Sequence, residues 1–86
     1  QWTRAEAMAR SILDELPGHA SARGVLAISL LQQGRSVEAR DEYLQIIGAN
    51  PQEFRVLAML GHLAVRSGDM GEARRHFEAA LRVAPT

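Results

Sequence analysis

The fold of this chain is decided by two consecutive segments of equal length, GHASARGVLAISLLQQGRSVEARDEYLQIIGANP (residues 18–51) and QEFRVLAMLGHLAVRSGDMGEARRHFEAALRVAP (residues 52–85). Each segment ends in a proline, and Pro17 precedes the first, so that the three prolines are spaced 34 residues apart. Shifting the chain by this period aligns residues of like size, namely Leu26 with Leu60, Gly34 with Gly68, Glu38 with Glu72, Ala39 with Ala73 and Tyr43 with Phe77. A fixed period of this length predicts a stack of equivalent structural units.

Each segment is expected to form two helices, because its apolar residues have helical rather than strand spacing. The first helices are predicted over residues 20–33 and 52–67, and the second helices over residues 37–48 and 70–83. Gly34 and Gly68 are expected to end the first helices in a left-handed conformation, and Ser36 to cap the helix that follows it. Asn50-Pro51 should stop that helix. Residues 3–16 match a second helix, which brings the expected total to five.

Small residues recur where the helices of a unit should meet. Ala27 and Gly61 are expected at the closest approach of the two helices, and Tyr43 and Phe77 are expected to fill the space beside them. A larger side chain at such a contact would overpack it.

The composition excludes several classes of protein. The 86 residues include ten basic and ten acidic side chains, so that no net field favours nucleic acid or an anionic membrane surface. No apolar run is long enough to span a bilayer. Without cysteine there is no disulfide and no thiolate ligand. All ten basic residues are arginine, which is typical of a genome rich in G and C, and we expect a bacterial source.

Catalytic and metal-binding patterns are lacking, and we expect neither an enzyme nor a cofactor. The three histidines, His19, His62 and His76, fall at different positions of the repeat, and none has a histidine or an acid four residues further along the same helix. Ser29 and His62 have no oxyanion-hole motif around them.

The remaining polar patterns also indicate surface rather than chemistry. Asp14-Glu15 and Asp41-Glu42 are acidic pairs that we expect to be solvated, since nothing apolar surrounds them to raise one pKa. The glycines are scattered and form no phosphate-binding loop.

The repeat resembles the tetratricopeptide repeat, whose signature places residues of set size at fixed offsets. The matching residues of the second unit are Leu57, Leu60, Gly61, Ala64, Ala73, Phe77 and Pro85, and those of the first are Arg23, Leu26, Ala27, Leu30, Ala39, Tyr43 and Pro51. Arg23 and Leu57 replace the usual Trp, and Leu30 and Ala64 the usual Tyr. A pentatricopeptide RNA-binding array would usually have a period of 35 residues and a more basic composition, so it is the weaker match.

The resemblance implies an all-α fold of antiparallel helix-turn-helix repeats, stacked as a right-handed α-solenoid of about 2.5 units. Residues 1–17 would be the second helix of an incomplete repeat, and residues 18–51 and 52–86 two complete units. The protein is expected to continue in both directions. The uncovered ends, including Phe77, Leu81 and Val83, could otherwise bring copies together as a homo-oligomer.

By the same resemblance, the first helices would line a concave groove that binds a partner segment. The groove residues implied are Ser21, Gly24, Val25, Ile28, Leu31 and Gln32 in the first unit, and Arg55, Ala58, Met59, His62, Val65 and Arg66 in the second. Among these, Ile28, Leu31, Gln32, Arg55, Met59, His62 and Arg66 are the predicted partner-binding residues. A protein or peptide segment with an acidic group and one or two aliphatic anchors would suit them.

Two alternatives stay open. These residues could be solvated scaffold, and the chain a spacer or self-associating segment of a larger protein, in the cytoplasm or the periplasm. The carboxylate clamp of chaperone-binding members is not matched, because Gly24, Ile28 and Met59 stand where its polar and basic residues would be.

Overall fold

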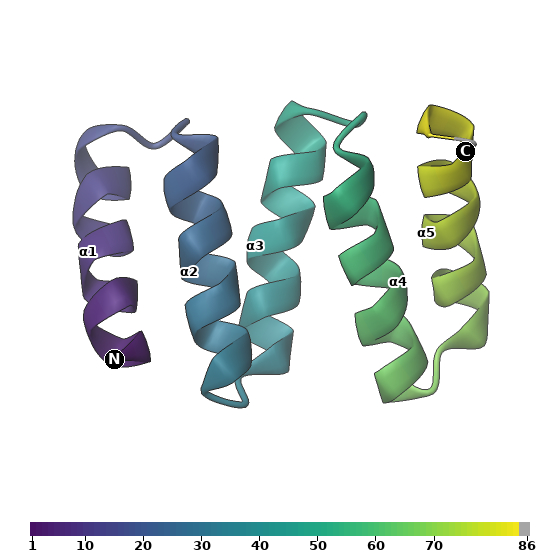
Figure 1. Ribbon diagram of the computed structural model, residues 1–86, viewed down its shortest axis with the longest axis horizontal. Coiled ribbons are helices and arrows are strands. Elements are labelled where there is room, and N and C mark those ends of the chain that lie inside the picture. Colours follow the sequence, from purple (N-terminus) through teal and green to yellow (C-terminus); the bar gives the residue numbers. More distant parts are fainter. Residues whose placement is uncertain (85–86) are drawn as a thin grey trace. The chain divides into compact units, whose positions relative to one another are not determined.

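Five α-helices account for most of the computed structural model, which describes residues 1–84 (Figure 1). The helices are α1 (Trp2–Glu15), α2 (Ala20–Gln32), α3 (Ser36–Ala49), α4 (Phe54–Ser67) and α5 (Met70–Val83). Residues 1–84 contain no strand. The all-α fold and the number of helices are therefore as predicted. Pro85, the third proline of the repeat, and Thr86 lie outside the described residues.

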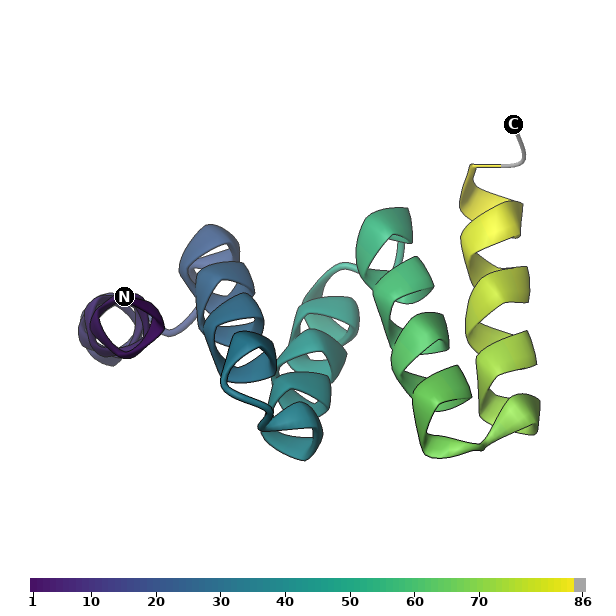
Figure 2. The same ribbon diagram turned by 60° about the horizontal axis from the view of Figure 1, so that its bottom comes forward.

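The chain divides within α3 into two compact units. The first comprises Gln1–Tyr43, and the second begins at Leu44. In the first unit α1 packs against α2, and in the second α4 packs against α5. Figures 1 and 2 both show α4 and α5 side by side, joined by a short turn and running in opposite directions. The second unit thus contains the antiparallel hairpin that the repeat predicts.

Both first helices end on a glycine with positive φ, as predicted. Gly34 has φ 76° and Gly68 has φ 86°. After Gly34, the Arg35 N–H donates to the Leu30 carbonyl at 2.9 Å, and after Gly68 the Asp69 N–H donates to the Ala64 carbonyl at the same distance. This is the Schellman arrangement, which satisfies carbonyls that a helix end otherwise leaves unpaired.

Three predicted helix starts were wrong by one or two residues. Helix α1 begins at Trp2 rather than residue 3. Helix α4 begins at Phe54 rather than residue 52, because the Asn50 side chain accepts a hydrogen bond from the Gln52 N–H and holds the chain in a turn. Ser36 is the first residue of α3 rather than the residue before it.

The caps that do form use other side chains. His19 Nδ1 accepts from the Ala22 N–H at 3.1 Å, and Asp69 Oδ1 accepts from the Glu72 N–H at 3.0 Å. Each of these side chains satisfies a donor in the first turn of its helix, α2 and α5 respectively.

Small residues allow the helices to approach closely, as predicted. A Cβ atom at Gly61 would lie 2.6 Å from Cε1 of Phe77, so that only glycine leaves room for this ring. Ala27 and Ala39 are completely buried, and Tyr43 is buried as well. Phe77 was also expected to be left uncovered at the end of the chain, but it is half-buried because it packs on α4.

Helix α2 is held in the first unit by polar contacts between side chains far apart in the sequence. Arg23 Nη1 donates to Glu42 Oε1 at 2.6 Å, and Arg23 Nη2 donates to the Pro17 carbonyl at 2.9 Å. The expectation that Glu42 is a solvated acid was therefore wrong. Its partner lies 19 residues away and only folding brings the two together.

Candidate partner-binding surface

The predicted binding residues of α4 form one stripe along the helix, Arg55, Met59, His62 and Arg66, which we call the α4 stripe. Arg55, His62 and Arg66 are exposed and Met59 is half-buried between them. The Arg55 guanidinium lies 5.8 Å from the centre of the Phe54 ring, a distance typical of a cation–π contact. The His62 ring meets the Phe77 ring edge to face, with centroids 5.3 Å apart. The stripe therefore offers cationic groups beside aromatic and aliphatic surface.

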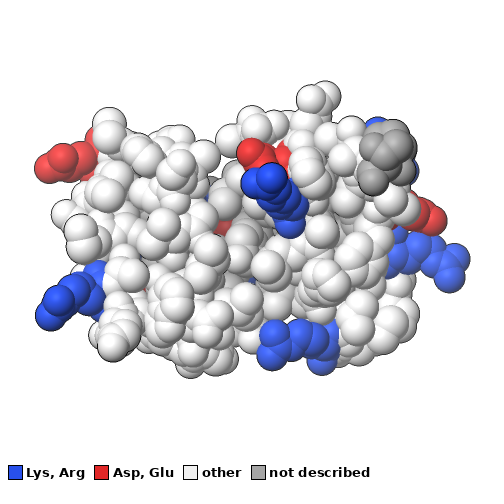
Figure 3. Space-filling view, viewed as in Figure 1, with Lys and Arg blue, Asp and Glu red and all other residues white. Residues whose placement is uncertain are grey.

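The predicted residues of α2 lie in the first unit and are mainly apolar. Ile28 is 43% exposed, Leu31 is half-buried and Gln32 is exposed. Val25, one turn before Ile28, is 45% exposed. On the face of this unit shown in Figure 3, charged side chains lie only toward the margins. The exposed side of α2 thus offers aliphatic surface at Val25 and Ile28 beside the polar side chains of Ser21 and Gln32.

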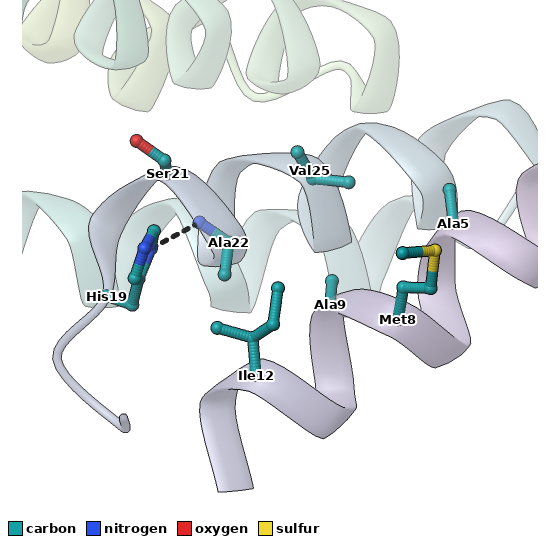
Figure 4. Close-up of a pocket in the computed structure, with 8 residues that line it drawn as sticks. All are labelled: Ala5, Met8, Ala9, Ile12, His19, Ser21, Ala22 and Val25. Carbon is teal, nitrogen blue, oxygen red and sulfur yellow. Dashed lines mark hydrogen bonds between the residues drawn. The ribbon is translucent and has the colours of Figure 1, made fainter. Parts of the chain in front are cut away.

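An apolar pocket of about 320 Å³ opens beside this surface, between α1 and α2 (Figure 4). We call it the α1–α2 groove. It is lined by Ala5, Met8, Ala9, Ile12, His19, Ser21, Ala22 and Val25. Met8 is 62% and Ile12 39% exposed, so that both are accessible to a partner.

Sequence reasoning did not predict the α1–α2 groove. Ser21 and Val25 were implied for another surface, the concave groove lined by the first helices, and the contribution of α1 was missed. The available signal was the spacing of Ala5, Met8 and Ile12, which places three apolar residues on one face of a helix.

The second unit has a larger and more polar pocket of about 500 Å³. Its walls come from α3, α4 and α5 and from the turn at Pro51, with Leu57 and Ala79 as apolar members and Arg82 as the charged one. Leu57 occupies the repeat position of Arg23, which in the first unit forms its pair with Glu42. The two units therefore differ in polarity at equivalent positions.

A network of charged side chains joins α1 to the turn between α2 and α3. Glu6 accepts from Gln33 at 2.9 Å and from Arg35 at 3.0 Å, and Arg35 also pairs with Glu38 at 2.7 Å. The hydrogen bond from Gln33, aided by Arg10 and Arg35, holds the pKa of Glu6 below its ordinary value. The hydrogen bond from Arg35 likewise lowers the pKa of Glu38. The network stabilises the packing of α1 without creating a reactive group.

Polar groups that could have been reactive are used structurally. The Ser29 hydroxyl is buried and donates to the Val25 carbonyl at 2.8 Å. His76 Nε2 lies 3.2 Å from Glu72 Oε2, an acid four residues before it. The sequence prediction concerned only residues four positions after each histidine and therefore missed this pair. Burial raises the pKa of the Tyr43 hydroxyl.

Two further kinds of site find no support in the described part of the chain. Within residues 1–84, no group of three or more potential ligand side chains is placed to hold a metal ion. Among the helices of the same residues, none combines the length and apolar character needed to cross a bilayer.

Comparison with known proteins agrees with the repeat seen in the sequence. Two family models described as tetratricopeptide repeat match the chain, one over residues 1–63 and the other over residues 54–86. No curated protein matches it. The period, the five helices and the glycine-terminated first helices are features of the same repeat. The chain therefore belongs to the tetratricopeptide repeat family.

Proposed function

We propose that this chain is a non-catalytic protein-interaction scaffold, which binds a partner segment through the exposed sides of its first helices. Tetratricopeptide repeats are in general protein–protein interaction modules, and two matches to that family cover the chain. The binding residues proposed are Ile28, Leu31 and Gln32 of α2 and Arg55, Met59, His62 and Arg66 of α4.

The observation that carries the proposal is the α4 stripe. Its two guanidinium groups, Arg55 and Arg66, are exposed, and the ion pairs found within residues 1–84 include neither of them. The contacts of Arg23 with Glu42 and of Arg35 with Glu6 and Glu38, by contrast, join helices or stabilise a turn. Two cations on one face of a first helix are therefore suited to a partner with carboxylates, since an arginine binds a carboxylate through two parallel hydrogen bonds.

The exposed side chains of α2 and α4 indicate which chemical groups a partner segment should carry. Ile28 and Val25 offer aliphatic surface on α2, and Met59 offers a flexible apolar contact on α4. A segment with an acidic group and one or two aliphatic side chains would match these surfaces. A scaffold role also agrees with the engagement of Ser29 in a backbone hydrogen bond and of His76 with Glu72.

Selection from a random peptide library displayed on phage would test the proposal even though the partner is unidentified. We expect the selected peptides to share an acidic residue near aliphatic ones. The double variant Arg55→Glu/Arg66→Glu should lower their affinity by about tenfold or more, because it replaces attraction with repulsion. The matched control is Arg74→Glu/Arg75→Glu, which makes the same charge change on exposed residues of α5. Equal loss in both variants, or none in the first, would contradict the proposal.

A second candidate is a spacer or self-associating segment of a larger, bacterial protein. It is favoured by the apolar residues that α5 leaves accessible, with Leu81 60% and Val83 39% exposed. Sedimentation equilibrium would show a concentration-dependent dimer that Leu81→Glu abolishes. A monomer at all concentrations would remove this candidate.

A further inference from the structure

The two arginines of the α4 stripe stand at a distance that one helix sets. Arg66 follows Arg55 by eleven residues, and both lie in α4, within the second unit. Since an α-helix rises by about 1.5 Å per residue, the two positions are about 16 Å apart along the helix axis. The distance between the two cations therefore limits where a partner can carry its acidic groups.

Between the two arginines the exposed side of α4 is largely apolar. Ala58 and Met59 are half-buried, and Val65 is 42% exposed. His62 is the one polar side chain in this part of the helix, and its ring contacts the Phe77 ring edge to face. A segment that reaches both arginines therefore passes over apolar surface.

The acids nearest to the two arginines do not neutralise them. Helix α4 itself contains no acidic residue. Asp69, which follows the helix, accepts a hydrogen bond from the Glu72 N–H and caps α5. Glu53, which precedes the helix, forms none of the ion pairs found within residues 1–84. In the described part of the second unit, both guanidinium groups are therefore free to bind carboxylates of another molecule.

The spacing of the α4 stripe favours a helical partner over an extended one. In an extended segment alternate side chains share a face, so that acids on one side lie about 13 or 20 Å apart, and neither distance matches the arginines. In a helix, residues eleven positions apart share a face and lie about 16 Å apart. The residues of the stripe also follow each other at intervals of four, three and four, which is the spacing at which one helix packs along another.

We propose that the α4 stripe binds a helix of a partner protein that carries two acidic residues eleven positions apart, with apolar residues four and seven positions after the first acid. The acids pair with Arg55 and Arg66, and the apolar side chains pack on Met59 and beside His62. The inference rests on the function proposed above and adds the conformation of the partner and the spacing of its acids.

The helices of the chain itself do not carry this pattern. Among the 86 residues, Glu42 and Glu53 are the only acids eleven positions apart. Helix α3 ends at Ala49, before Glu53, and Ile46 between the two acids is only 6% exposed. Glu42 is also paired with Arg23. A second copy of the chain therefore does not supply the partner helix.

Three designed peptides test the proposal. The probe peptide is a helix of alanine and glutamine that carries two glutamates and two leucines at the proposed spacing. A hydrocarbon staple on its opposite side keeps it helical, since isolated helices of this length are marginal. The first control peptide exchanges the second glutamate with the second leucine, which brings the acids to about 10 Å apart on the same face. The second control peptide has no staple and carries a proline in its middle, which breaks the helix.

Titration of the isotope-labelled chain with each peptide, followed by methyl NMR, measures both affinity and location. We expect the probe peptide to bind about tenfold tighter than either control peptide, because only the probe places a carboxylate at both arginines. Methyl signals of Met59 and Val65 should shift, and that of Met70 in α5 should not.

Variants of the chain test the two contacts. Arg55→Glu/Arg66→Glu should weaken binding of the probe peptide by about tenfold or more, whereas Arg74→Glu/Arg75→Glu, the same charge change on exposed residues of α5, should not. With Arg55→Glu alone, a probe in which one glutamate is replaced by lysine should recover affinity. Which of the two glutamates must be replaced gives the direction of the bound helix, because the intervals of the stripe are the same in both directions.

Several results would overturn the proposal. These are equal affinity of the probe and either control peptide, no binding at about millimolar concentration, or a dimer of the chain that Arg55→Glu/Arg66→Glu dissociates, which would make a second copy the occupant. Failure of a longer form of the protein to bind a probe that residues 1–86 bind would make a flanking segment the occupant. If peptides selected on phage still require Arg55 and Arg66 but carry their acids at other spacings, the inference fails and the proposed function stands. If they do not require these arginines, the proposed function fails as well.

Discussion

Arg23 of α2 and Glu42 of α3 form a half-buried ion pair, with 2.6 Å between Nη1 and Oε1. The same guanidinium reaches the Pro17 carbonyl, so that one side chain ties α2 to α3 and to the turn after α1. In the next repeat its position is held by Leu57, which is buried. The family pattern usually has a Trp there, and this chain fills the position once with an ion pair and once with an aliphatic side chain.

Removing the acid of this pair should destabilise the first unit. We expect Glu42→Ala to lower the free energy of unfolding by about 1–3 kcal/mol, because Arg23 loses a charged acceptor in a half-buried site. Asp41→Ala changes the neighbouring exposed acid and should stay within about 0.5 kcal/mol of the parent. Urea denaturation followed by circular dichroism measures both, and equal effects would argue against the pair.

Gly61 should not tolerate even one added methyl group. Alanine in a helix normally gains about 1 kcal/mol over glycine, but its Cβ would lie 2.6 Å from the Phe77 ring. We expect Gly61→Ala to be destabilising by about 1–2 kcal/mol despite that gain. The control is Gly24→Ala in α2, where a Cβ meets nothing within 4 Å and the substitution should stabilise. The double variant Gly61→Ala/Phe77→Leu should recover part of the loss, and a stable Gly61→Ala single variant would refute the contact.

Acid should weaken the network around Arg35. Glu6 and Glu38 both have a pKa below the ordinary value of 4.5 in the folded chain. Near pH 4.5 the unfolded chain therefore binds more protons than the folded chain, and stability falls as the pH drops through and below this value. Melting temperatures measured across this range should decrease less steeply for Glu6→Gln/Glu38→Gln than for the parent. Parallel curves would show that these carboxylates do not carry the acid sensitivity.

Local signals in the sequence were sufficient for most of the fold. The helix over residues 70–83 was predicted with its observed bounds. The helix ends at Gly34 and Gly68 were predicted correctly because a left-handed backbone conformation is a local property that favours glycine. The start of α4 was missed because a side-chain hydrogen bond of Asn50 competes with the helix.

Features that depend on tertiary contacts could not be predicted in the same way. Glu42 was expected to be solvated, and the sequence did not reveal its partner Arg23 because the two residues are 19 positions apart. The α1–α2 groove was not predicted, because the spacing of Ala5, Met8 and Ile12 marks one apolar face of a helix without showing that α2 leaves this face open. The predicted binding residues were identified by position in the repeat, and their exposure agrees with a surface role without testing it.

The most direct test of the central proposal is photocrosslinking from the α4 stripe. The photoreactive residue p-benzoylphenylalanine would be introduced at position 59 and, as control, at position 70, which replaces an exposed methionine of α5. Irradiation with a peptide from the phage selection should crosslink it at position 59 and not at position 70. Crosslinking at position 70 alone, or equally at both positions, would contradict binding through the first helix.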